Sequence, residues 1–263
     1  MANLSSFAKK YGPWAAVAGA SEGLGAAFAE ALASRKINLI LLARREAMLA
    51  GLAESLQKKH GVEIRTAICD LADPGFPEVL KKASAGIEVG LGIYNAAYSF
   101  IGPLLDKPLE SALRVVDVNI RGPLYFLHTL GPAMKERGRG GLVLMSSIAG
   151  FQGSPRLATY AASKAFNIVL GESLWSELKS HGVDVLVTCA GAIRTPNYNA
   201  TQTGEAPGTL EPSAVAEKTL RSLGKGPIAV PGFVNQLARF FLGRLLSRRG
   251  AVGVMDRSTK GLQ

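Results

Sequence analysis

A tyrosine and a lysine four residues apart are the pair in this sequence best suited to acid/base chemistry. Tyr160 and Lys164 occur in the run YAASK, and a spacing of four places both side chains on one face of a helix. An ammonium group beside a phenol favours the phenolate, so we expect Lys164 to lower the pKa of Tyr160 toward working pH. Ser147 ends an apolar run upstream and offers a hydroxyl to a substrate oxygen. The pattern predicts general acid/base catalysis.

A glycine-rich turn follows the first apolar run of the chain. Residues 18–25 read AGASEGLG and open a helical pattern. Glycines allow a tight turn and bring backbone amides close to a pyrophosphate at the positive end of a helix. The spacing is GxxxGxG rather than GxGxxG, and taken alone the turn also fits a simple loop. Its place between the first strand and the first helix favours a dinucleotide site.

Two arginines end the second apolar run, where an enzyme that prefers NAD(H) usually has an acid. The guanidinium groups of Arg44 and Arg45 match the oxygens of a 2′-phosphate. We therefore expect NADP(H) rather than NAD(H). An exposed pair at the start of a helix is the alternative, and Glu22 adds negative charge nearby.

Short apolar runs alternate with helical patterns along the whole chain, and this order is typical of a parallel sheet covered on both faces. The expected strands are Trp14–Ala18, Ile37–Ala43, Glu63–Cys69, Val89–Asn95, Gly141–Ser146, Val183–Cys189 and Pro227–Val230. The expected helices are Leu24–Arg35, Arg45–Lys59, Leu109–Glu136, Tyr160–His181 and Pro212–Leu223. The sequence predicts one doubly wound, Rossmann-type α/β domain over residues 1–263, with about seven parallel strands.

Two segments depart from this alternation. Thr195–Pro212 is polar and rich in proline, which is typical of a lid or binding loop. The C-terminal segment, residues 235–263, is apolar and basic. Its large apolar side chains could contact a membrane surface, a partner subunit or the protein's own core, and we expect the membrane least, because the arginines do not segregate to one face of a helix.

Composition sets limits on the class of protein. Of 263 residues, 48% are hydrophobic and 19% charged, which allows a sizeable core. Cys69 and Cys189 lie in apolar runs without CxxC spacing, and the three histidines lack ligand spacing, so we expect reduced thiols and no metal site. The apolar runs are too short to span a bilayer. We expect a soluble, cytoplasmic protein whose net charge of +10 supports only weak, non-specific binding of nucleic acid.

In this order, these residues resemble the short-chain dehydrogenase/reductase family, in its compact single-domain branch, over about residues 14–232. The matching motifs are the glycine turn, Asp70-Leu71, Asn95-Ala96-Ala97, Asn119, the set of Ser147, Tyr160 and Lys164, and residues 190–195. The resemblance implies a nicotinamide cofactor that contacts Gly19, Ser21, Gly23, Leu24, Gly25, Arg44, Arg45, Asp70, Leu71, Asn95, Ala96, Tyr160, Lys164, Ile193 and Thr195.

The resemblance also implies the catalytic roles. Tyr160 would exchange a proton with the substrate oxygen while hydride passes between the nicotinamide and the carbonyl carbon. Lys164 would hold the ribose hydroxyls and tune Tyr160. Ser147 would position the substrate oxygen, and Asn119 would hold a water that links Lys164 to solvent. Members of the family pair through long helices, so we expect a homodimer or a homotetramer.

Three alanines depart from the family pattern: Ala18 replaces a threonine, Ala97 a glycine and Ala190 a proline. They bear on cofactor affinity rather than on catalysis. The leading hypothesis is an NADP(H)-dependent oxidoreductase for a fairly apolar carbonyl or secondary alcohol, such as a steroid-like, fatty-acyl or aromatic compound. A 3-oxoacyl-thioester reductase is one alternative, and an NADP(H)-sensing protein without turnover is another.

Overall fold

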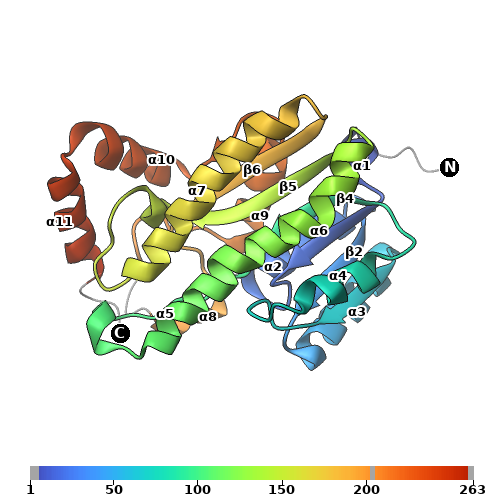
Figure 1. Ribbon diagram of the computed structural model, residues 1–263, viewed down its shortest axis with the longest axis horizontal. Helices are drawn as coiled ribbons and strands as arrows, with labels where there is room; N and C mark the ends of the chain where they lie inside the picture. The colour runs from blue at the N-terminus through green and yellow to red at the C-terminus, as the bar shows by residue number, and fades with distance from the viewer. Residues whose placement is uncertain (1–5, 202–204, 260–263) are drawn as a thin grey trace.

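A computed structural model describes residues 6–201 and 205–259, and in this part of the chain seven strands form one parallel sheet (Figure 1). The strands are β1 (Trp14–Ala18), β2 (Asn38–Ala43), β3 (Ile64–Ile68), β4 (Val89–Tyr94), β5 (Gly140–Ser147), β6 (Val183–Ala190) and β7 (Ile228–Ala229). Their order is β3-β2-β1-β4-β5-β6-β7. The order reverses between β1 and β4, and in such sheets ligands bind beyond the carboxyl ends of the strands at this point.

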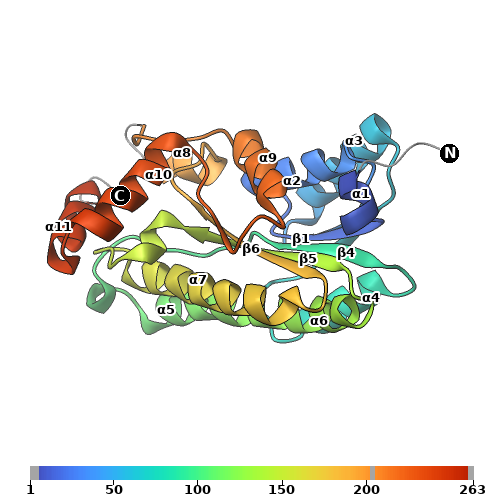
Figure 2. The ribbon, with the colours of Figure 1, turned by 90° about the horizontal axis from the view of Figure 1, so that it is seen from above.

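Helices cover both faces of the sheet (Figure 2). One layer contains α1 (Ser6–Tyr11), α2 (Gly23–Ala33), α3 (Glu46–His60) and α9 (Pro212–Ser222). The other contains α4 (Phe76–Ser84), α5 (Leu109–Val116), α6 (Gly122–Glu136) and α7 (Ala158–Lys179). Each layer packs its own apolar cluster against the sheet, with Phe28 in one and Phe126 in the other fully buried. The predicted doubly wound fold is confirmed, and its two apolar faces explain why the strand sequences are almost continuously apolar.

The expected helix over Leu109–Glu136 is interrupted by a π-helical turn, η2 (Asp117–Arg121). The Tyr94 hydroxyl donates a hydrogen bond to the Val118 carbonyl oxygen at 2.6 Å. That oxygen would accept from Gly122 N in an α-helix, but Gly122 N donates instead to Asp117 O. A side chain inserted into the hydrogen-bond ladder thus widens the helix there. The turn carries Asn119, which is fully buried.

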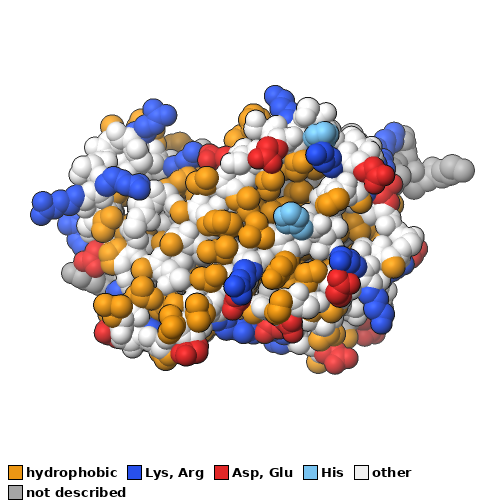
Figure 3. All heavy atoms as spheres, in the orientation of Figure 1, with side chains coloured by type: hydrophobic (Ala, Val, Ile, Leu, Met, Phe, Trp, Pro, Cys, Tyr) orange, Lys and Arg blue, Asp and Glu red, His pale blue; other side chains and the backbone are white. Residues whose placement is uncertain are grey.

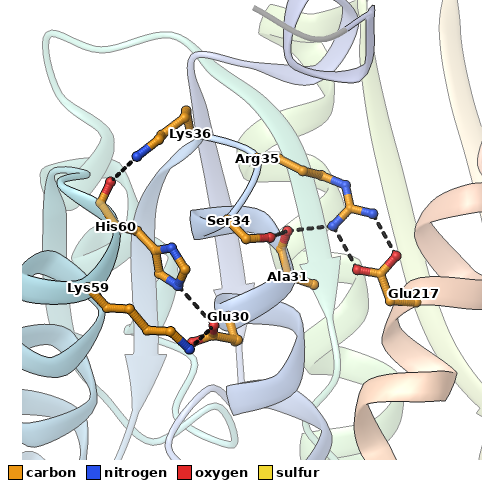
Figure 4. Close-up of polar contacts among 8 residues, drawn as sticks. All are labelled: Glu30, Ala31, Ser34, Arg35, Lys36, Lys59, His60 and Glu217. Atoms are coloured by element: carbon orange, nitrogen blue, oxygen red, sulfur yellow. Dashed lines mark hydrogen bonds and ion pairs between the residues drawn. The ribbon is translucent and has the colours of Figure 1, made fainter.

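A polar network ties the C-terminal end of α2 to its neighbours (Figure 4). Arg35 donates to both carboxylate oxygens of Glu217 on α9, at 2.9 and 2.7 Å. Glu30 contacts Lys59 at 2.7 Å and His60 at 2.9 Å at the end of α3. The bidentate pair fixes α9 against α2. His60 is therefore part of a helix-end network, and among the described residues no cluster of histidine, cysteine and acidic side chains could hold a metal ion.

The two segments that depart from the alternation are partly helical. The 195–212 segment contains the short helix α8 (Pro196–Thr201), so it is not wholly a loop, and its residues 202–204 lie outside the described residues. The C-terminal segment contains α10 (Phe233–Phe240), the π-turn η4 (Phe241–Leu245) and α11 (Arg248–Thr259), which extend from one end of the molecule (Figure 1). Residues 260–263 of the apolar and basic segment are likewise outside the described part.

The large apolar side chains of the C-terminal segment face outward. Phe240 and Phe241 are about half exposed and Leu245 is more so. The sequence left three alternatives open for these residues: contact with a membrane surface, with a partner subunit or with the protein's own core. Their exposure shows that the third, burial in the core, is wrong. No helix within residues 6–201 and 205–259 combines the length and apolar character that a membrane span requires.

Candidate active site

A cavity of about 670 Å³ lies at the carboxyl ends of the strands. With one exception, every residue predicted to bind the cofactor lines it: Gly19, Ser21, Gly23, Leu24, Arg44, Arg45, Asp70, Leu71, Asn95, Ala96, Tyr160, Lys164, Ile193 and Thr195. The exception is Gly25, which is buried in the first turn of α2. Residues far apart in the sequence thus meet at the point where the strand order reverses.

The glycine turn is shaped by close backbone contacts. Gly19 has φ +80°, and a Cβ atom there would lie 2.8 Å from the backbone of Ala96. A Cβ atom on Gly25 would lie 1.9 Å from the Gly19 carbonyl oxygen. Side chains at these positions would force the turn open or fill the cavity wall. The turn, the start of α2 and a cavity of this size fit a dinucleotide cofactor.

Hydrogen bonds around Ala18 join the glycine turn to the end of β4, the two segments that a threonine hydroxyl at position 18 would otherwise connect. The Ala18 carbonyl oxygen accepts hydrogen bonds from the backbone amides of Asn95 and Ala96, both at 3.0 Å. The Asn95 side chain donates to the Gly19 carbonyl oxygen at 3.0 Å. The glycine turn is therefore joined to the end of β4 without a hydroxyl at position 18. Ala97 lines the cavity just beyond this junction.

Charged groups meet where β2 ends. The Arg45 guanidinium contacts the Glu22 carboxylate at 2.7 Å and donates to the Ser21 hydroxyl at 2.9 Å. Arg44 is exposed and lines the same part of the cavity. Because Glu22 neutralises Arg45, Arg44 contributes most of the positive charge offered to an anion there.

A second ion pair lies across the cavity from α2. The Arg114 guanidinium on α5 donates to the Asp70 carboxylate at 2.6 Å and stacks on the Tyr98 ring at 5.7 Å. Burial is the largest single influence on Asp70, and it raises the pKa of the carboxyl group. The hydrogen bond from Arg114 and other nearby contacts lower the pKa by more in total, so the pKa lies below its ordinary value. Asp70 is therefore held as a carboxylate in a fixed direction at the cavity wall.

Tyr160 and Lys164 both lie in the first turns of α7 and line the cavity, as their spacing predicts. The Lys164 ammonium nitrogen lies 5.4 Å from the centre of the Tyr160 ring and donates to the Met145 carbonyl oxygen at 2.8 Å. Lys164 is 3% exposed. A second bond, from the Ser146 hydroxyl to the Lys164 carbonyl oxygen at 2.8 Å, fixes α7 to the end of β5.

The expected direction of the Tyr160 pKa shift is wrong for this structure. Burial raises the pKa of Tyr160, and a hydrogen bond with Ser147 lowers it by less. Burial also lowers the pKa of Lys164 from 10.5 to about 8. Lys164 therefore loses positive charge more easily than an exposed lysine, and its ammonium group is directed to a carbonyl oxygen rather than to the phenol. Tyr160 is a protonated phenol at neutral pH, which makes it a proton donor.

Asn119 lies behind the cavity wall rather than on it. Its amide nitrogen donates to the Tyr98 carbonyl oxygen at 2.9 Å and to the Ser163 hydroxyl at 3.0 Å. Its side-chain oxygen accepts from Tyr98 N at 2.8 Å, and its carbonyl oxygen accepts from Asn167 at 2.9 Å. Asn119 thus joins the π-turn to α7 and to the loop after β4.

Ser147 lies at the last position of β5, beside the cavity lining formed by Met145 and Ser146. Its hydroxyl oxygen accepts a hydrogen bond from Ala149 N at 3.2 Å, which begins the turn after the strand. The hydroxyl also bonds to Tyr160. The structure therefore brings together Ser147, Tyr160 and Lys164.

Several lining residues were not predicted from the sequence, chiefly Tyr98, Ser99, Arg114 and Tyr198. Arg114 occupies one position of an ordinary amphipathic helix, and no spacing distinguishes it from a surface arginine. Tyr198 belongs to the polar 195–212 segment, so the sequence indicated the segment but not the residue. Tyr98 follows the Asn95 motif closely, and that proximity was an available signal.

Comparison with known proteins agrees with this geometry. A family model for short chain dehydrogenases matches residues 13–206. The chain belongs to the short-chain dehydrogenase/reductase family, whose members are oxidoreductases acting on alcohol and carbonyl groups.

Two relatives illustrate the range of functions nearby. A 7beta-hydroxysteroid dehydrogenase of Collinsella aerofaciens is 30% identical over 234 residues, which cover 87% of this chain and 89% of that protein. A very-long-chain 3-oxoacyl-CoA reductase of Pyricularia oryzae is 36% identical over 209 residues, which cover 74% of this chain and 62% of that protein. The second alignment leaves more than a third of the reductase unmatched.

Solved structures show the same architecture. A 7beta-hydroxysteroid dehydrogenase superposes with a TM-score of 0.90 at 28% identity, covering 95% of this chain and 99% of that one. A short-chain dehydrogenase from Sphingobium yanoikuyae, solved in complex with NADPH, has a TM-score of 0.75 at 26% identity and covers 83% and 87% of the two chains. In the first of these structures the likeness extends over nearly the full length.

Proposed function

We propose that this protein transfers hydride between NADP(H) and the carbonyl or secondary alcohol carbon of a bulky, fairly apolar substrate, with Tyr160 as general acid and base. The observation that carries the proposal is the joint position of Tyr160 and Lys164 at a dinucleotide-sized cavity. The nicotinamide cofactor, when bound, supplies or accepts the hydride. The protein contributes position, proton transfer and exclusion of water.

The site residues divide the work between them. Tyr160 gives its proton to the substrate oxygen during reduction and takes it back during oxidation. Ser147 contacts Tyr160, and when substrate binds, its single hydroxyl hydrogen would turn to the substrate oxygen and keep that oxygen near the phenol. Lys164 would hold hydroxyls of the cofactor's ribose, and its burial limits the directions in which its ammonium group can point. Asn119 is proposed to help fix the backbone at Tyr160, because its amide donates to the Ser163 hydroxyl and that hydroxyl donates to the Tyr160 carbonyl oxygen.

NADP(H) is the proposed cofactor because of the charge at the end of β2. Arg44 and Ser21 line the cavity and would contact an adenosine 2′-phosphate, and Asp70 and Leu71, which also line it, would contact the adenine. The glycine turn and the residues Asn95, Ala96, Ile193 and Thr195 complete the proposed contacts. The relative solved with NADPH supports this preference.

The proposed substrate is steroid-like. The cavity wall also contains Tyr98, Val118, Ile193 and Tyr198, which offer aromatic and apolar surface. The lining cations are Arg44, Arg45, Arg114 and Lys164, and Arg114 is already paired with Asp70. A small keto acid would need a free cation beside Tyr160. The likeness to a hydroxysteroid dehydrogenase over almost the whole chain supports the same choice.

A 3-oxoacyl thioester is the second candidate substrate. The 36% identity with a very-long-chain 3-oxoacyl-CoA reductase favours it, and an acyl chain would fit the same apolar wall. The thioester's nucleotide or carrier would have to lie outside the cavity, against the basic surface. Comparing 3-oxoacyl-CoA with the corresponding free ketone distinguishes the two, because a true thioester reductase loses most of its kcat/KM on the free ketone.

We propose that two or four copies assemble through the layer of α5, α6 and α7. Leu109 and Leu113 on α5 and Val169 on α7 are at least half exposed, and Figure 3 shows hydrophobic side chains gathered on this face. Burying them against a second copy removes apolar surface from water. Sedimentation of the parent and of a Leu113→Glu, Val169→Glu variant tests this assignment.

The proposed function is tested by NADPH oxidation with a panel of oxo-steroids, aromatic ketones, 3-oxoacyl-CoA and small keto acids. We expect turnover with oxo-steroids at a kcat/KM well above that for small keto acids. Tight binding of NADPH with no turnover across the panel would instead identify a cofactor sensor.

A further inference from the structure

The C-terminal helix α10 is attached to the body of the protein by a polar residue. Asn235 is 2% exposed and is the buried residue of this helix. Its apolar neighbours point away, and Phe233 is 76% exposed. A helix that packs for stability alone would bury the apolar side chains instead. The buried amide therefore indicates a specific contact.

Both hydrogens of the Asn235 amide are used. The amide nitrogen donates to the Gly208 carbonyl oxygen at 3.1 Å and to the Pro231 carbonyl oxygen at 3.0 Å. The first bond joins α10 to the end of the 195–212 segment, and the second closes the turn that precedes α10. A side chain without two donors would leave these buried oxygens without their partner.

Three glycines make room for this amide. A Cβ atom on Gly191 would lie 2.4 Å from the Asn235 side-chain oxygen, and one on Gly208 would lie 2.7 Å from it. A Cβ atom on Gly232 would lie 3.1 Å from the amide nitrogen. Gly208 and Gly232 also have positive φ angles, of +81° and +85°. Three separate parts of the chain thus approach one side chain more closely than any other residue type would allow.

One of the residues close to the Asn235 side chain, Gly191, lies in the wall of the cavity. Gly191 lines it together with Ala192 and Ile193. Leu210 N donates to the Ala192 carbonyl oxygen at 3.0 Å, and Arg194 N donates to the Leu210 carbonyl oxygen at 2.9 Å. Residues 208–210 are therefore paired with residues 192–194, and Asn235 supports both from behind.

We propose that Asn235 is a positioning residue for the active site: through residues 208–210 it fixes residues 191–193, which line the cavity. The C-terminal helix thereby becomes part of the substrate-binding unit, although none of its residues lines the cavity. The effect on catalysis rests on the proposed function, whereas the effect on the backbone does not.

The direct test is Asn235→Asp, which keeps the shape of the side chain but removes both donors. Hydrogen exchange should speed up at the Leu210 and Arg194 amides, which pair the two segments, by about tenfold, the factor expected for one buried hydrogen bond. The KM for the carbonyl substrate should rise by a similar factor. The Kd for NADPH should rise by a smaller factor than KM, because the glycine turn and Arg44 keep their positions and only Ile193 of the proposed cofactor contacts lies in the affected segment. The kcat should change less than about threefold, because Tyr160 is untouched. Phe233→Ala, at a neighbouring position of α10 that is 76% exposed, is the matched control.

A pair of size changes tests the contact itself. Gly191→Ala alone should raise KM, because its methyl group meets the Asn235 oxygen. In an Asn235→Ala background the same change should cost little more, since the colliding atoms are gone. This non-additivity is independent of whether Asn235→Asp folds well.

Three outcomes would overturn the proposal. The first is unchanged exchange at Leu210 and Arg194 in Asn235→Asp. The second is a loss of thermal stability with KM unaltered, and the third is additive effects in the Gly191 and Asn235 pair; either of these would make Asn235 a purely structural residue. If the parent enzyme turned over no carbonyl compound, the proposed function would fail, while the exchange measurement would still decide the role of Asn235.

Discussion

Replacing Arg44 with alanine should change the cofactor preference of this enzyme more than any other single substitution. Arg44 is exposed at the end of β2 and faces the cavity. Arg45 is already held by Glu22 at 2.7 Å and by Ser21. A 2′-phosphate would therefore take most of its new charge-assisted hydrogen bonds from Arg44.

The size of the effect follows from the kind of contact. A hydrogen bond to a charged group contributes about 1.5–3 kcal/mol, and the exposure of Arg44 places it in the lower half of that range. At about 1.4 kcal/mol for each factor of ten, the Kd for NADPH should rise about 10- to 40-fold. The Kd for NADH, which lacks the phosphate, should change by less than about twofold. Arg45→Ala should cost less, because Glu22 already neutralises Arg45, and Glu22→Gln should tighten NADPH binding.

The assay is titration of both cofactors by fluorescence, with kcat/KM measured alongside. Lys58→Ala removes one positive charge from the exposed face of α3 and controls for a general loss of charge. Equal weakening of NADPH and NADH in Arg44→Ala, or a larger effect from Lys58→Ala, would show that Arg44 does not contact the 2′-phosphate and that the preference has another origin.

Three further predictions concern protons and stability. Because burial raises the pKa of Tyr160, the phenol stays protonated through neutral pH. The kcat for carbonyl reduction should therefore be constant through neutral pH and fall at alkaline pH, while the kcat for alcohol oxidation should rise there. Parallel pH profiles in the two directions would refute this. Lys164→Met should abolish turnover yet raise stability at pH 7, because the buried ammonium has a pKa of only about 8; the gain in urea midpoint over the parent should shrink as the pH rises above 8, because the parent's lysine is then deprotonated in the folded state but still protonated in the unfolded state, so that folding releases a proton. Tyr11→Phe removes a 2.6 Å bond to Asp184 far from the cavity, so it should cost about 1–2 kcal/mol of stability without changing kcat; a change in kcat would contradict that separation.

The fold and much of the site could be predicted because they depend on local pattern. Apolar runs the length of a strand, alternating with helical patterns, define the layers, and the glycine turn stands between the first strand and the first helix. Tyr160 and Lys164 are neighbours on one helix, so their spacing alone places them together. The π-turn at Asn119 was missed because it depends on the Tyr94 hydroxyl, which reaches Val118 from another element.

The remaining features depend on contacts between distant residues. The pKa of Tyr160 is raised because the side chain is buried, and the spacing of residues in the sequence does not show how deeply a side chain will be buried. The pairing of Arg114 with Asp70 joins residues 44 positions apart. Asn235 is an ordinary polar residue in the sequence, and only the arrangement of three glycines around it shows its importance.

The central claim is that the Tyr160 phenol exchanges the proton with the substrate. Tyr160→Phe removes one oxygen and keeps the ring, so NADPH should still bind with nearly the parent's Kd. Single-turnover reduction of the best ketone of the panel should slow by about 10²–10⁴-fold, the usual contribution of a positioned general acid. Reduction at the parent's rate by Tyr160→Phe, with NADPH fully bound, would contradict the mechanism.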